Sequence, residues 1–408
     1  MISPPIYLDH HATTRVDPRV VEAMLPYLTE TYGNPASTTH SFGWEAKAAV
    51  DAARESIAAA IGAQAKEVYF TSGATESNNL ALFGAAERAA VERTPQRGSH
   101  LIGVVTEHPS VLDPLERLGR RGYRVTLLGV QQAPGPEAGR IRAEQVAEAI
   151  GERTILVSVM LANNEIGAIQ PLEEIGRVCR QRGVLLHTDA TQAVGKIPVD
   201  VDRLGVDLMS FTAHKMYGPK GVGALYVRRR SPPIRLEPLI HGGGHERGLR
   251  SGTLNVPGIV GFARALQLCL EEMPQETIRL RALRDRLYQG LTAALPDAVL
   301  NGPALAPPEW RLPGNLNVSF AGVEAETLLL SMKDLAVSTG SACTSANPEP
   351  SHVLRALGLP DPMVHGSLRF GLGRPNTEEE VEFAIGRVSE TVKRLRLMPI
   401  FPGGVAEG

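Results

Sequence analysis

Three groups of residues in this sequence stand where their side chains could do chemistry together. Gly73-Ala-Thr75 precedes a helical pattern, where backbone N–H groups, the helix dipole and a hydroxyl can hold a phosphate. Asp189 follows an apolar strand pattern, and a carboxylate buried there needs a cationic partner. Lys215 follows His214, and a partly desolvated lysine is a nucleophilic amine. A phosphate cradle, an acid for a pyridinium nitrogen and a lysine able to form a Schiff base are the groups that pyridoxal phosphate requires.

Each of these features alone has an ordinary structural explanation. The Gly73 segment could be a capping turn, Asp189 could cap a helix, and Lys215 could be a surface lysine. Their combination favours a cofactor site, because five polar clusters follow predicted strands and ligands of open α/β sheets bind beyond the carboxyl ends of the strands. The clusters are 71–79, 106–108, 163–165, 187–192 and 212–215.

The motifs of several other enzyme classes are missing from the sequence. It contains no P-loop, no G-x-G-x-x-G that opens a helix and no G-x-S-x-G nucleophile elbow. His241 and His245 have the i, i+4 spacing of a helical metal site, but the three glycines between them disfavour that helix. We therefore expect a Gly-rich loop over 241–248 and no metal site.

The elements that must position the polar clusters alternate between strand and helix patterns over residues 15–260. The predicted strands are 67–71, 101–106, 123–128, 155–161, 184–187, 207–212 and 223–227. Helical patterns such as 143–150 and 172–182 lie between several of them, and Asp17-Pro18 indicates an earlier helix start. This alternation predicts an α/β fold with a mainly parallel, seven-stranded sheet covered on both faces.

The pattern changes after Pro257. Helical patterns over 258–272 and 275–295 lead to strand patterns at 315–320 and 367–371 and to a closing helix over 377–395. These elements predict a smaller α+β domain. We expect a large domain over 15–260, a small domain made of 1–14 with 261–400, and a tail over 401–408.

Composition and charge exclude several classes of protein. The 408 residues carry 42 Lys+Arg against 44 Asp+Glu, which gives no electrostatic argument for direct nucleic-acid binding. No apolar run reaches the length of a transmembrane helix, and the first residues lack the regions of a signal peptide. The cysteines Cys179, Cys269 and Cys343 fit neither a zinc site nor a disulfide framework. We expect a soluble, cytoplasmic protein that binds no membrane.

Motifs spread over roughly residues 6 to 396 carry a resemblance to a known family. They are 7–9, 12–14, 33–37, 71–79, 106–108, 163–167, 189–192, 214–221, 241–248, 250–253, 341–346 and 367–370. In these motifs the chain resembles the cysteine desulfurases of the NifS/IscS type. The resemblance implies a class V aminotransferase-like, pyridoxal-phosphate-dependent enzyme of fold type I, a sulfurtransferase that converts L-cysteine to L-alanine.

The resemblance also implies a role for each residue of the site. Lys215 would attach the cofactor, His108 would be the acid–base group over its ring, and Cys343 would receive the sulfur as a persulfide. Arg369 would bind the substrate carboxylate, a task that suits a guanidinium, together with Asn164. The cofactor-binding residues would be Ala74, Thr75, His108, Asn164, Asp189, Gln192, Thr212, His214, Lys215 and, from a second subunit, Thr253. No resident metal is implied, although Cys343 could contact an iron–sulfur cluster transiently.

The environments of the three cysteines differ. Cys343 lies in a run of small and turn-forming residues, which is typical of a mobile loop that could carry a persulfide to an acceptor. Cys179 and Cys269 lie in apolar helical patterns, which favours burial. His10-His11 departs from the Asn-Ala or Tyr-Ser that the family commonly shows, and would alter proton transfer near the substrate.

The partners that the resemblance implies are a second copy of the chain, L-cysteine and sulfur-acceptor proteins. Iron–sulfur cluster assembly on a scaffold protein is the first expectation for the acceptor, and tRNA thiolation is another. Two alternatives stay open at this point. One is a selenocysteine lyase or another pyridoxal-phosphate lyase or aminotransferase, and the other is a catalytically silent scaffold in a sulfur-assembly complex.

Overall fold

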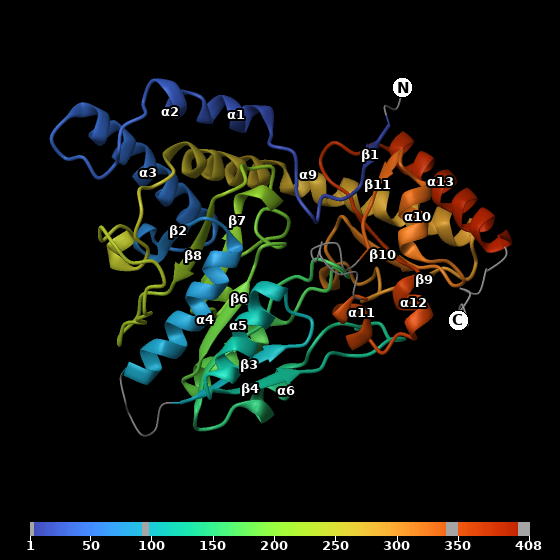
Figure 1. Cartoon of the computed structure of the whole chain (residues 1–408), viewed down its shortest axis with the longest axis horizontal. Helices are drawn as coiled ribbons and strands as arrows, with labels where there is room; N and C mark the ends of the chain where they lie inside the picture. Colours follow the sequence, from blue (N-terminus) through green and yellow to red (C-terminus); the bar gives the residue numbers. More distant parts are fainter. Residues whose placement is uncertain (1–3, 92–97, 340–349, 399–408) are drawn as a thin grey trace, which may run out of the picture.

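The computed structural model describes residues 4–91, 98–339 and 350–398 (Figure 1). Its main sheet consists of β2 (Val68–Thr71), β3 (His100–Val104), β4 (Arg124–Leu128), β5 (Thr154–Ser158), β6 (Leu185–Asp189), β7 (Leu208–Thr212) and β8 (Gly223–Val227). The strand order is β2-β8-β7-β6-β5-β3-β4. Only the β8 pairings, to β2 and β7, are antiparallel. The seven predicted strands and the mainly parallel sheet are confirmed.

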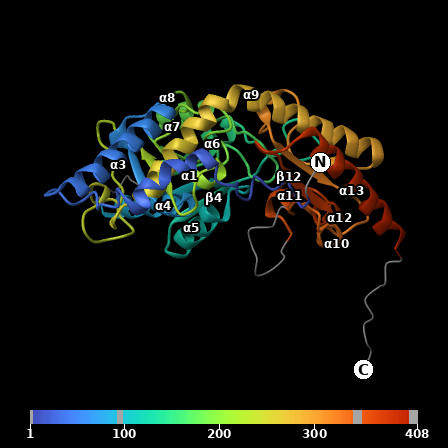
Figure 2. The same cartoon turned by 90° about the horizontal axis from the view of Figure 1, so that it is seen from above.

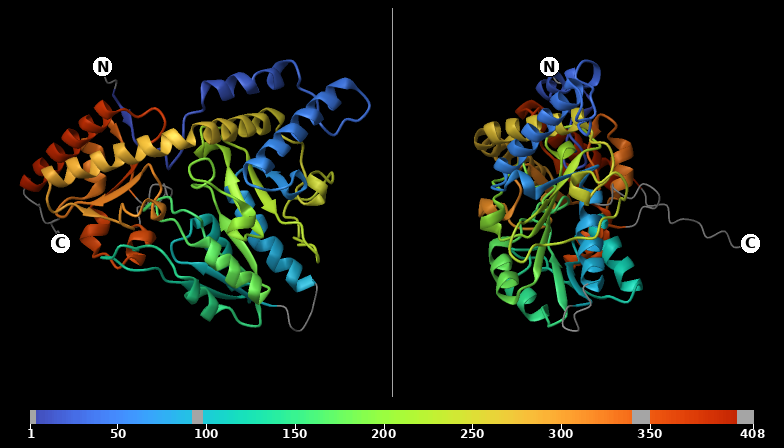
Figure 3. Two further views of the ribbon diagram at one scale, coloured as in Figure 1. Left: turned by 180° about the vertical axis from the view of Figure 1, so that it is seen from behind. Right: turned by 90° about the vertical axis from the view of Figure 1, so that its left-hand side faces the viewer.

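Helices cover both faces of this sheet, as the strand pattern predicts (Figure 3). One face packs against α4 (Ala74–Val91) and α5 (Pro109–Arg120), and the other against α3 (Ser41–Ala60) and α7 (Leu172–Arg182). Strand β7 shows the alternation directly, since Leu208 packs on the face with α4 and α5 and Met209 and Phe211 pack on the opposite face. A strand buried on both sides needs apolar residues at nearly every position.

The two helices predicted over 258–272 and 275–295 are one continuous helix, α9 (Val256–Ala294), of 39 residues. The prediction of a break near Pro274 is wrong. Proline removes one hydrogen-bond donor and disfavours a helix interior, but packing on both sides of Pro274 outweighs that cost. Phe262 and Leu266 pack in the core of the main sheet, and Leu287 packs in a second core. Figure 2 shows α9 running across both parts of the molecule.

The second core belongs to a smaller antiparallel sheet with the order β12 (Ser367–Gly371), β10 (Asn315–Ser319) and β9 (Val299–Leu300). Helix α13 (Glu378–Leu397) packs in the same core, as do Ile6 and Leu8 from the N-terminal end. Strand β1 (Ile6–Tyr7) pairs in parallel with β11 (Leu335–Ala336). Helix α9 packs first in the core of the main sheet and then in the core of the smaller sheet, so the division between the two cores falls inside this helix and not at residue 260. The domain limits predicted above stay a prediction.

The remaining helices are short. They are α1 (Pro18–Met24), α2 (Pro26–Thr29), α6 (Ala143–Ala149), α8 (Val201–Leu204), α10 (Ala325–Ser331), α11 (His352–Ala356) and α12 (Asp361–His365). Asp17 caps α1 by accepting the N–H of Arg19, with Pro18 at the first helical position, as predicted. Within the described ranges, no helix is both long enough and apolar enough to cross a bilayer.

The Gly-rich segment 241–248 is a loop that ends in the 3₁₀ turn η3 (Glu246–Gly248), as predicted. Glu246 anchors it to the main sheet. Its carboxylate oxygens accept two hydrogen bonds from Arg54 of α3, at 2.6 and 2.7 Å, and one from the N–H of Phe70 at 2.7 Å. A buried pair satisfied in this way holds one end of an otherwise exposed loop in place.

Candidate active site

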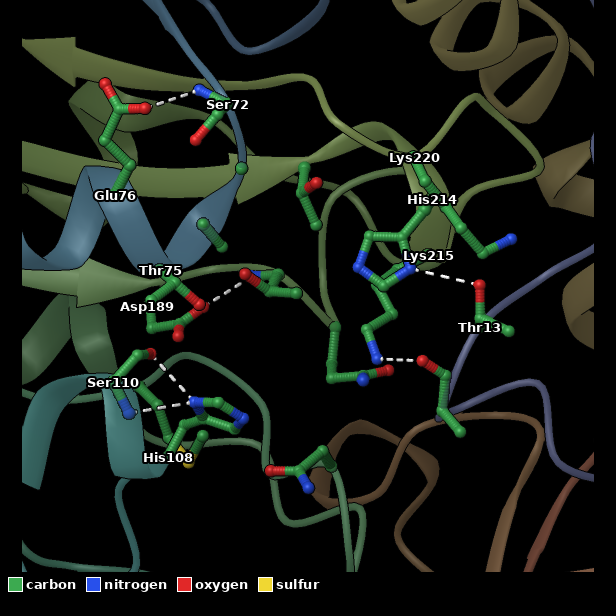
Figure 4. Close-up of a pocket in the computed structure, with 18 of the residues that line it drawn as sticks. Thr13, Ser72, Thr75, Glu76, His108, Ser110, Asp189, His214, Lys215 and Lys220 are labelled. Carbon is green, nitrogen blue, oxygen red and sulfur yellow. Dashed lines mark hydrogen bonds between the residues drawn. The ribbon is translucent and has the colours of Figure 1, made fainter. Parts of the chain in front are cut away.

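A cavity of about 550 Å³ lies beyond the carboxyl ends of the main sheet's strands (Figure 4). All five predicted polar clusters come to it or next to it. The lining includes Ser72, Ala74, Thr75, His108, Ser110, Asn164, Asp189, Gln192, Thr212, His214, Lys215 and Lys220. Ala12 and Thr13 of the N-terminal segment close another side. The convergence follows from the parallel strands, which place their carboxyl ends at one edge.

One end of the cavity is suited to an anion. Helix α4 begins at Ala74, so the amide groups of its first turn have no partner within the helix and carry the positive end of its dipole. The turn sits close to β8 because position 223 is a glycine, where an added Cβ would lie 2.7 Å from the Cα of Gly73. An added Cβ at Gly73 would meet nothing nearer than Thr212 Oγ1, at 3.9 Å. Gly223 therefore allows the turn to pack against β8, and Gly73 leaves this end of the cavity open.

Two side chains predicted to hold the phosphate are themselves held in place. Thr212 Oγ1 donates its hydrogen to the carbonyl of Val222 at 2.9 Å, so its oxygen is available as an acceptor only. His214 Nδ1 lies 3.1 Å from Thr13 Oγ1. Burial, followed by the charge of Lys215, lowers the pKa of His214 to about 4, so its ring is neutral at pH 7.

Asp189 and Lys215 stand at the ends of the neighbouring strands β6 and β7. The Asp189 carboxylate, which is buried, accepts the N–H of Thr191 at 2.9 Å on one oxygen and the amide of Asn78 at 2.7 Å on the other. Lys215 closes the 3₁₀ turn η2 (Ala213–Lys215), and its Nζ donates to the carbonyls of His11, at 2.7 Å, and Ala12. An acid and an amine thus face one cavity from adjacent strands.

His108 occupies the N-cap position of α5, directly before Pro109. Its Nδ1 accepts the backbone N–H of Ser110 at 3.1 Å, which is the capping bond of the helix. Burial lowers the pKa of His108 below its ordinary value, although the charge of Asp189 opposes the shift. The ring therefore faces the cavity in its neutral form near pH 7.

Lys196 and His11 hold Gln192 from behind by hydrogen bonds. The sequence predicts no role for Lys196, and it predicts His11 near the substrate rather than behind Gln192. Gln192 Oε1 accepts from Lys196 Nζ at 2.6 Å and lies 3.1 Å from His11 Nδ1, and its Nε2 donates to the carbonyl of His11 at 2.9 Å. The spacing of four residues between Gln192 and Lys196 is a signal that could have found this contact. Neither His10 nor His11 lines the large cavity, and burial lowers both pKa values, that of His10 to about 4. Both rings are therefore neutral at pH 7.

Lys196 is expected to make stability depend on pH. Burial, helped by the charge of Lys215, lowers its pKa from 10.5 to about 7. The unfolded chain then binds more protons than the folded protein between pH 7 and the unfolded pKa, so stability rises with pH in that window. From pH 7 to 10 we expect the wild type to gain on the order of 2–3 kcal/mol over Lys196→Met. Urea unfolding at several pH values measures this difference, and a difference that stays constant would contradict the expectation.

Two predicted site residues do not line the cavity. Arg369 is fully buried on β12, where it donates to Asp9 Oδ1 at 2.9 Å and Ser338 Oγ at 2.7 Å, and to the carbonyl of Asn164 at 3.3 Å. Arg369 therefore lies behind Asn164, which lines the cavity. Thr253 is exposed and does not line the cavity of its own chain. Their predicted roles in binding stay predictions.

The structure describes two of the three cysteines. Cys179 and Cys269 are buried, and burial raises the pKa of both thiols to about 12. Their predicted burial is confirmed. Cys343 lies outside the described residues, and its predicted role stays a prediction.

Comparisons with known proteins agree with this geometry. The family model of the aminotransferase class-V family matches residues 6–383. The cysteine desulfurase IscS of Anaeromyxobacter dehalogenans is 55% identical over 97% of this chain and 94% of its own length. The IscS of Neisseria meningitidis serogroup A is 53% identical over 98% and 95%. The chain spans nearly all of both relatives.

Solved structures give the same result for the fold. A NifS-like protein has a TM-score of 0.85 at 39% identity, with 95% of this chain and 99% of that chain covered. SspA, solved in complex with cysteine, has a TM-score of 0.76 at 36% identity, with 90% and 98% covered. The chain belongs to the aminotransferase class-V family, among its cysteine desulfurases.

Proposed function

We propose that this chain uses pyridoxal phosphate to take the sulfur atom from L-cysteine, passes it to a cysteine of its own and releases L-alanine. The observation that carries the proposal is the placement of Asp189 and Lys215 at the ends of adjacent strands, in one cavity with the N-terminus of α4. The cysteine desulfurases among the relatives support it.

The residues present fit this cofactor. The first turn of α4, with the space that Gly73 leaves open, suits a phosphate. Asp189 is a buried acid for a pyridinium nitrogen, and Gln192 would contact a ring substituent. Lys215 supplies the amine for covalent attachment. When bound, pyridoxal phosphate supplies an electron-accepting ring that stabilises negative charge at the α-carbon of an amino acid.

The residues of the chain would divide the remaining work. The amine of Lys215, held by the carbonyls of His11 and Ala12, would remove the α-proton of the substrate. Arg369 would attract the substrate carboxylate from behind Asn164, with which it already shares a hydrogen bond. His108 would contact the substrate inside the cavity through its imidazole ring.

We propose Cys343 as the sulfur acceptor. Cys179 and Cys269 do not line the cavity, and their raised pKa values keep them protonated at pH 7, which leaves Cys343 among the three cysteines of the sequence. Its thiolate would form a bond to the substrate sulfur while the Cβ–S bond breaks. The electron pair left on Cβ takes a proton to give the methyl group of alanine, and Cys343 keeps the persulfide.

A substrate panel tests this proposal against the related activities. Purified protein saturated with pyridoxal phosphate is given L-cysteine, L-selenocysteine, or L-alanine with a 2-oxo acid. The proposal predicts alanine and bound sulfur from L-cysteine, and no amino-group transfer. Turnover of selenocysteine alone would favour the selenocysteine lyase, and no turnover of any substrate would favour the silent scaffold. We propose iron–sulfur cluster assembly as the use of the sulfur, with tRNA thiolation as the alternative.

We also propose a homodimer in which each copy contributes to the other's site. Apolar side chains are exposed on α1, α2 and α3 and on the segments that join these helices. They are Val21, Leu25, Leu28, Tyr32, Phe42 and Trp44. Tyr32 and Phe42 pack with ring centroids 5.5 Å apart, yet are 66% and 46% exposed. A patch of this kind needs a cover, and a second copy would also bring Thr253, which does not line its own cavity.

The dimer is expected to depend on this patch. Light scattering of the wild type should give about twice 43.8 kDa. Trp44→Asp should reduce the mass to that of one chain and lower activity, because the second copy no longer completes the site. Leu330→Asp is the matched control, since Leu330 is 73% exposed on α10, a helix that packs in the core of the smaller sheet. A fully active wild-type monomer would contradict the proposal.

A further inference from the structure

Four side chains form a continuous hydrogen-bonded chain along one wall of the cavity. Asn78 Nδ2 donates to Asp189 Oδ2 at 2.7 Å and to Ser110 Oγ at 2.8 Å. Ser110 Oγ lies 2.8 Å from His108 Nδ1. Asn78 is fully buried, and Ser110 and Asp189 are nearly so, so no water competes strongly for these groups.

The donors and acceptors in this chain can be ordered from Asp189 outward. The Asp189 carboxylate only accepts, so Asn78 must present its NH₂ group, whose two hydrogens serve Asp189 and Ser110. The reversed amide would place Asn78 Oδ1 against the carboxylate. The orientation leaves Asn78 Oδ1 buried without a partner among the described residues, which costs less than an amide oxygen set against a carboxylate.

The order continues to the imidazole ring. Because Ser110 Oγ accepts from Asn78, its single hydrogen remains to be donated to His108 Nδ1. The backbone N–H of Ser110 donates to the same nitrogen at 3.1 Å. Two donors on one nitrogen require a lone pair there, so the ring proton sits on Nε2, at the edge turned away from Ser110 (Figure 4).

We propose that Ser110 and Asn78 are positioning residues that hold His108 as its neutral Nε2–H tautomer, so that the ring donates a hydrogen bond to the cavity and has no lone pair there to accept a proton. This inference rests on the proposed function for the use of that hydrogen bond. A second proton on Nδ1 would break two hydrogen bonds at once. Acceptance of a proton from the substrate then falls to another group.

The net effect of burial and of the charged groups around the ring agrees with this assignment. Burial has the largest effect on the pKa of His108 and lowers it. Lys215 of η2 and His352 of α11 lower it further, whereas Asp189 of β6 and Asp113 of α5 raise it. Glu107, the residue before His108, is buried and has a raised pKa, which favours its neutral form. The hydrogen bonds from Ser110 add to the lowering effect of burial.

The test observes the ring directly, in the full-length protein loaded with pyridoxal phosphate. The 11 histidines are labelled with ¹⁵N, and His108→Gln assigns the His108 signals. In the wild type we expect an unprotonated Nδ1 and a protonated Nε2 from pH 6 to pH 8. Ser110→Ala should mix the tautomers and raise the His108 pKa by about 0.5 to 1 unit. Ser110→Thr keeps the hydroxyl and should behave as the wild type.

A second pair of variants separates the hydrogen-bonded chain from general effects of charge. Asn78→Asp removes the two-hydrogen donor and should shift the ring signals as Ser110→Ala does. Asn79→Asp makes the same change one residue later, where the amide donates to the carbonyl of Thr75, and should leave the ring signals unchanged. The acid limb of kcat/KM should move with the ring pKa, with a loss of about threefold to tenfold in kcat at pH 7 for Ser110→Ala.

Three results would overturn the inference. They are a protonated Nδ1 in the wild type, equal ring signals for Ser110→Ala and the wild type, and equal shifts for the Asp variants at positions 78 and 79. The ring signals do not depend on which substrate the enzyme uses. A wild type with the expected tautomer that makes no alanine from L-cysteine would therefore refute the proposed function and leave the tautomer assignment standing.

Discussion

Replacing Lys215 by alanine is expected to abolish covalent attachment of pyridoxal phosphate and to reduce alanine formation by more than about 10³-fold. The amine stands at the end of β7, where the other polar clusters converge, and it is the residue proposed both to attach the cofactor and to move the α-proton. The fold should persist, since two backbone carbonyls that lose a donor can bind water in an open cavity. Visible absorption of the bound cofactor and circular dichroism measure the two effects.

Lys220 is the matched control because it lines the same cavity. Borohydride reduction of the loaded wild type, followed by peptide mapping, should place the cofactor on Lys215. Lys220→Ala should keep the covalent attachment. A label on Lys220, or a Lys215→Ala variant that still forms the reducible linkage, would contradict the assignment.

The second large effect is expected for Cys343→Ala. The thiol acts only after the substrate is bound, so the variant should bind the cofactor and still show a spectral change with L-cysteine. Alanine formation should fall by about 10³-fold or more, and no persulfide should form. The measurement is quantitation of alanine and of protein-bound sulfur.

Cys179→Ala and Cys269→Ala are the matched controls. Both cysteines are buried away from the cavity, so these variants should keep activity and lose on the order of 1 kcal/mol of stability. Alanine release by Cys343→Ala at near the wild-type rate would contradict the role of Cys343, and pyruvate with ammonia and sulfide in place of alanine would favour a lyase that expels sulfide directly.

The sequence predicts the fold and the position of the cavity well because both depend on local pattern. Strands buried on both faces are read from continuous apolar runs, and β7 is an example. The ends of parallel strands then bring Asp189 and Lys215 together without further information. The same reasoning failed at Pro274, because two separate cores keep α9 continuous through the proline and local preference cannot show them.

The finer features of the site could not be predicted because they depend on residues distant in sequence. Asn78 and Asp189 are 111 residues apart, and nothing in either neighbourhood indicates their contact. Arg369 illustrates the opposite case. The resemblance indicates its role, but only the structure shows its guanidinium already paired with Asp9, behind the cavity wall. Distances and hydrogen-bond directions thus require the folded chain.

The most direct test of the central claim is a single turnover of the purified protein loaded with pyridoxal phosphate. One equivalent of L-cysteine per subunit is added without a reductant, and the products are separated and weighed by mass spectrometry. The proposed function predicts one alanine per subunit and one additional sulfur atom on the peptide that contains Cys343. Pyruvate, ammonia and sulfide in place of alanine, or an additional sulfur atom on the peptide of Cys179 or Cys269, would contradict it.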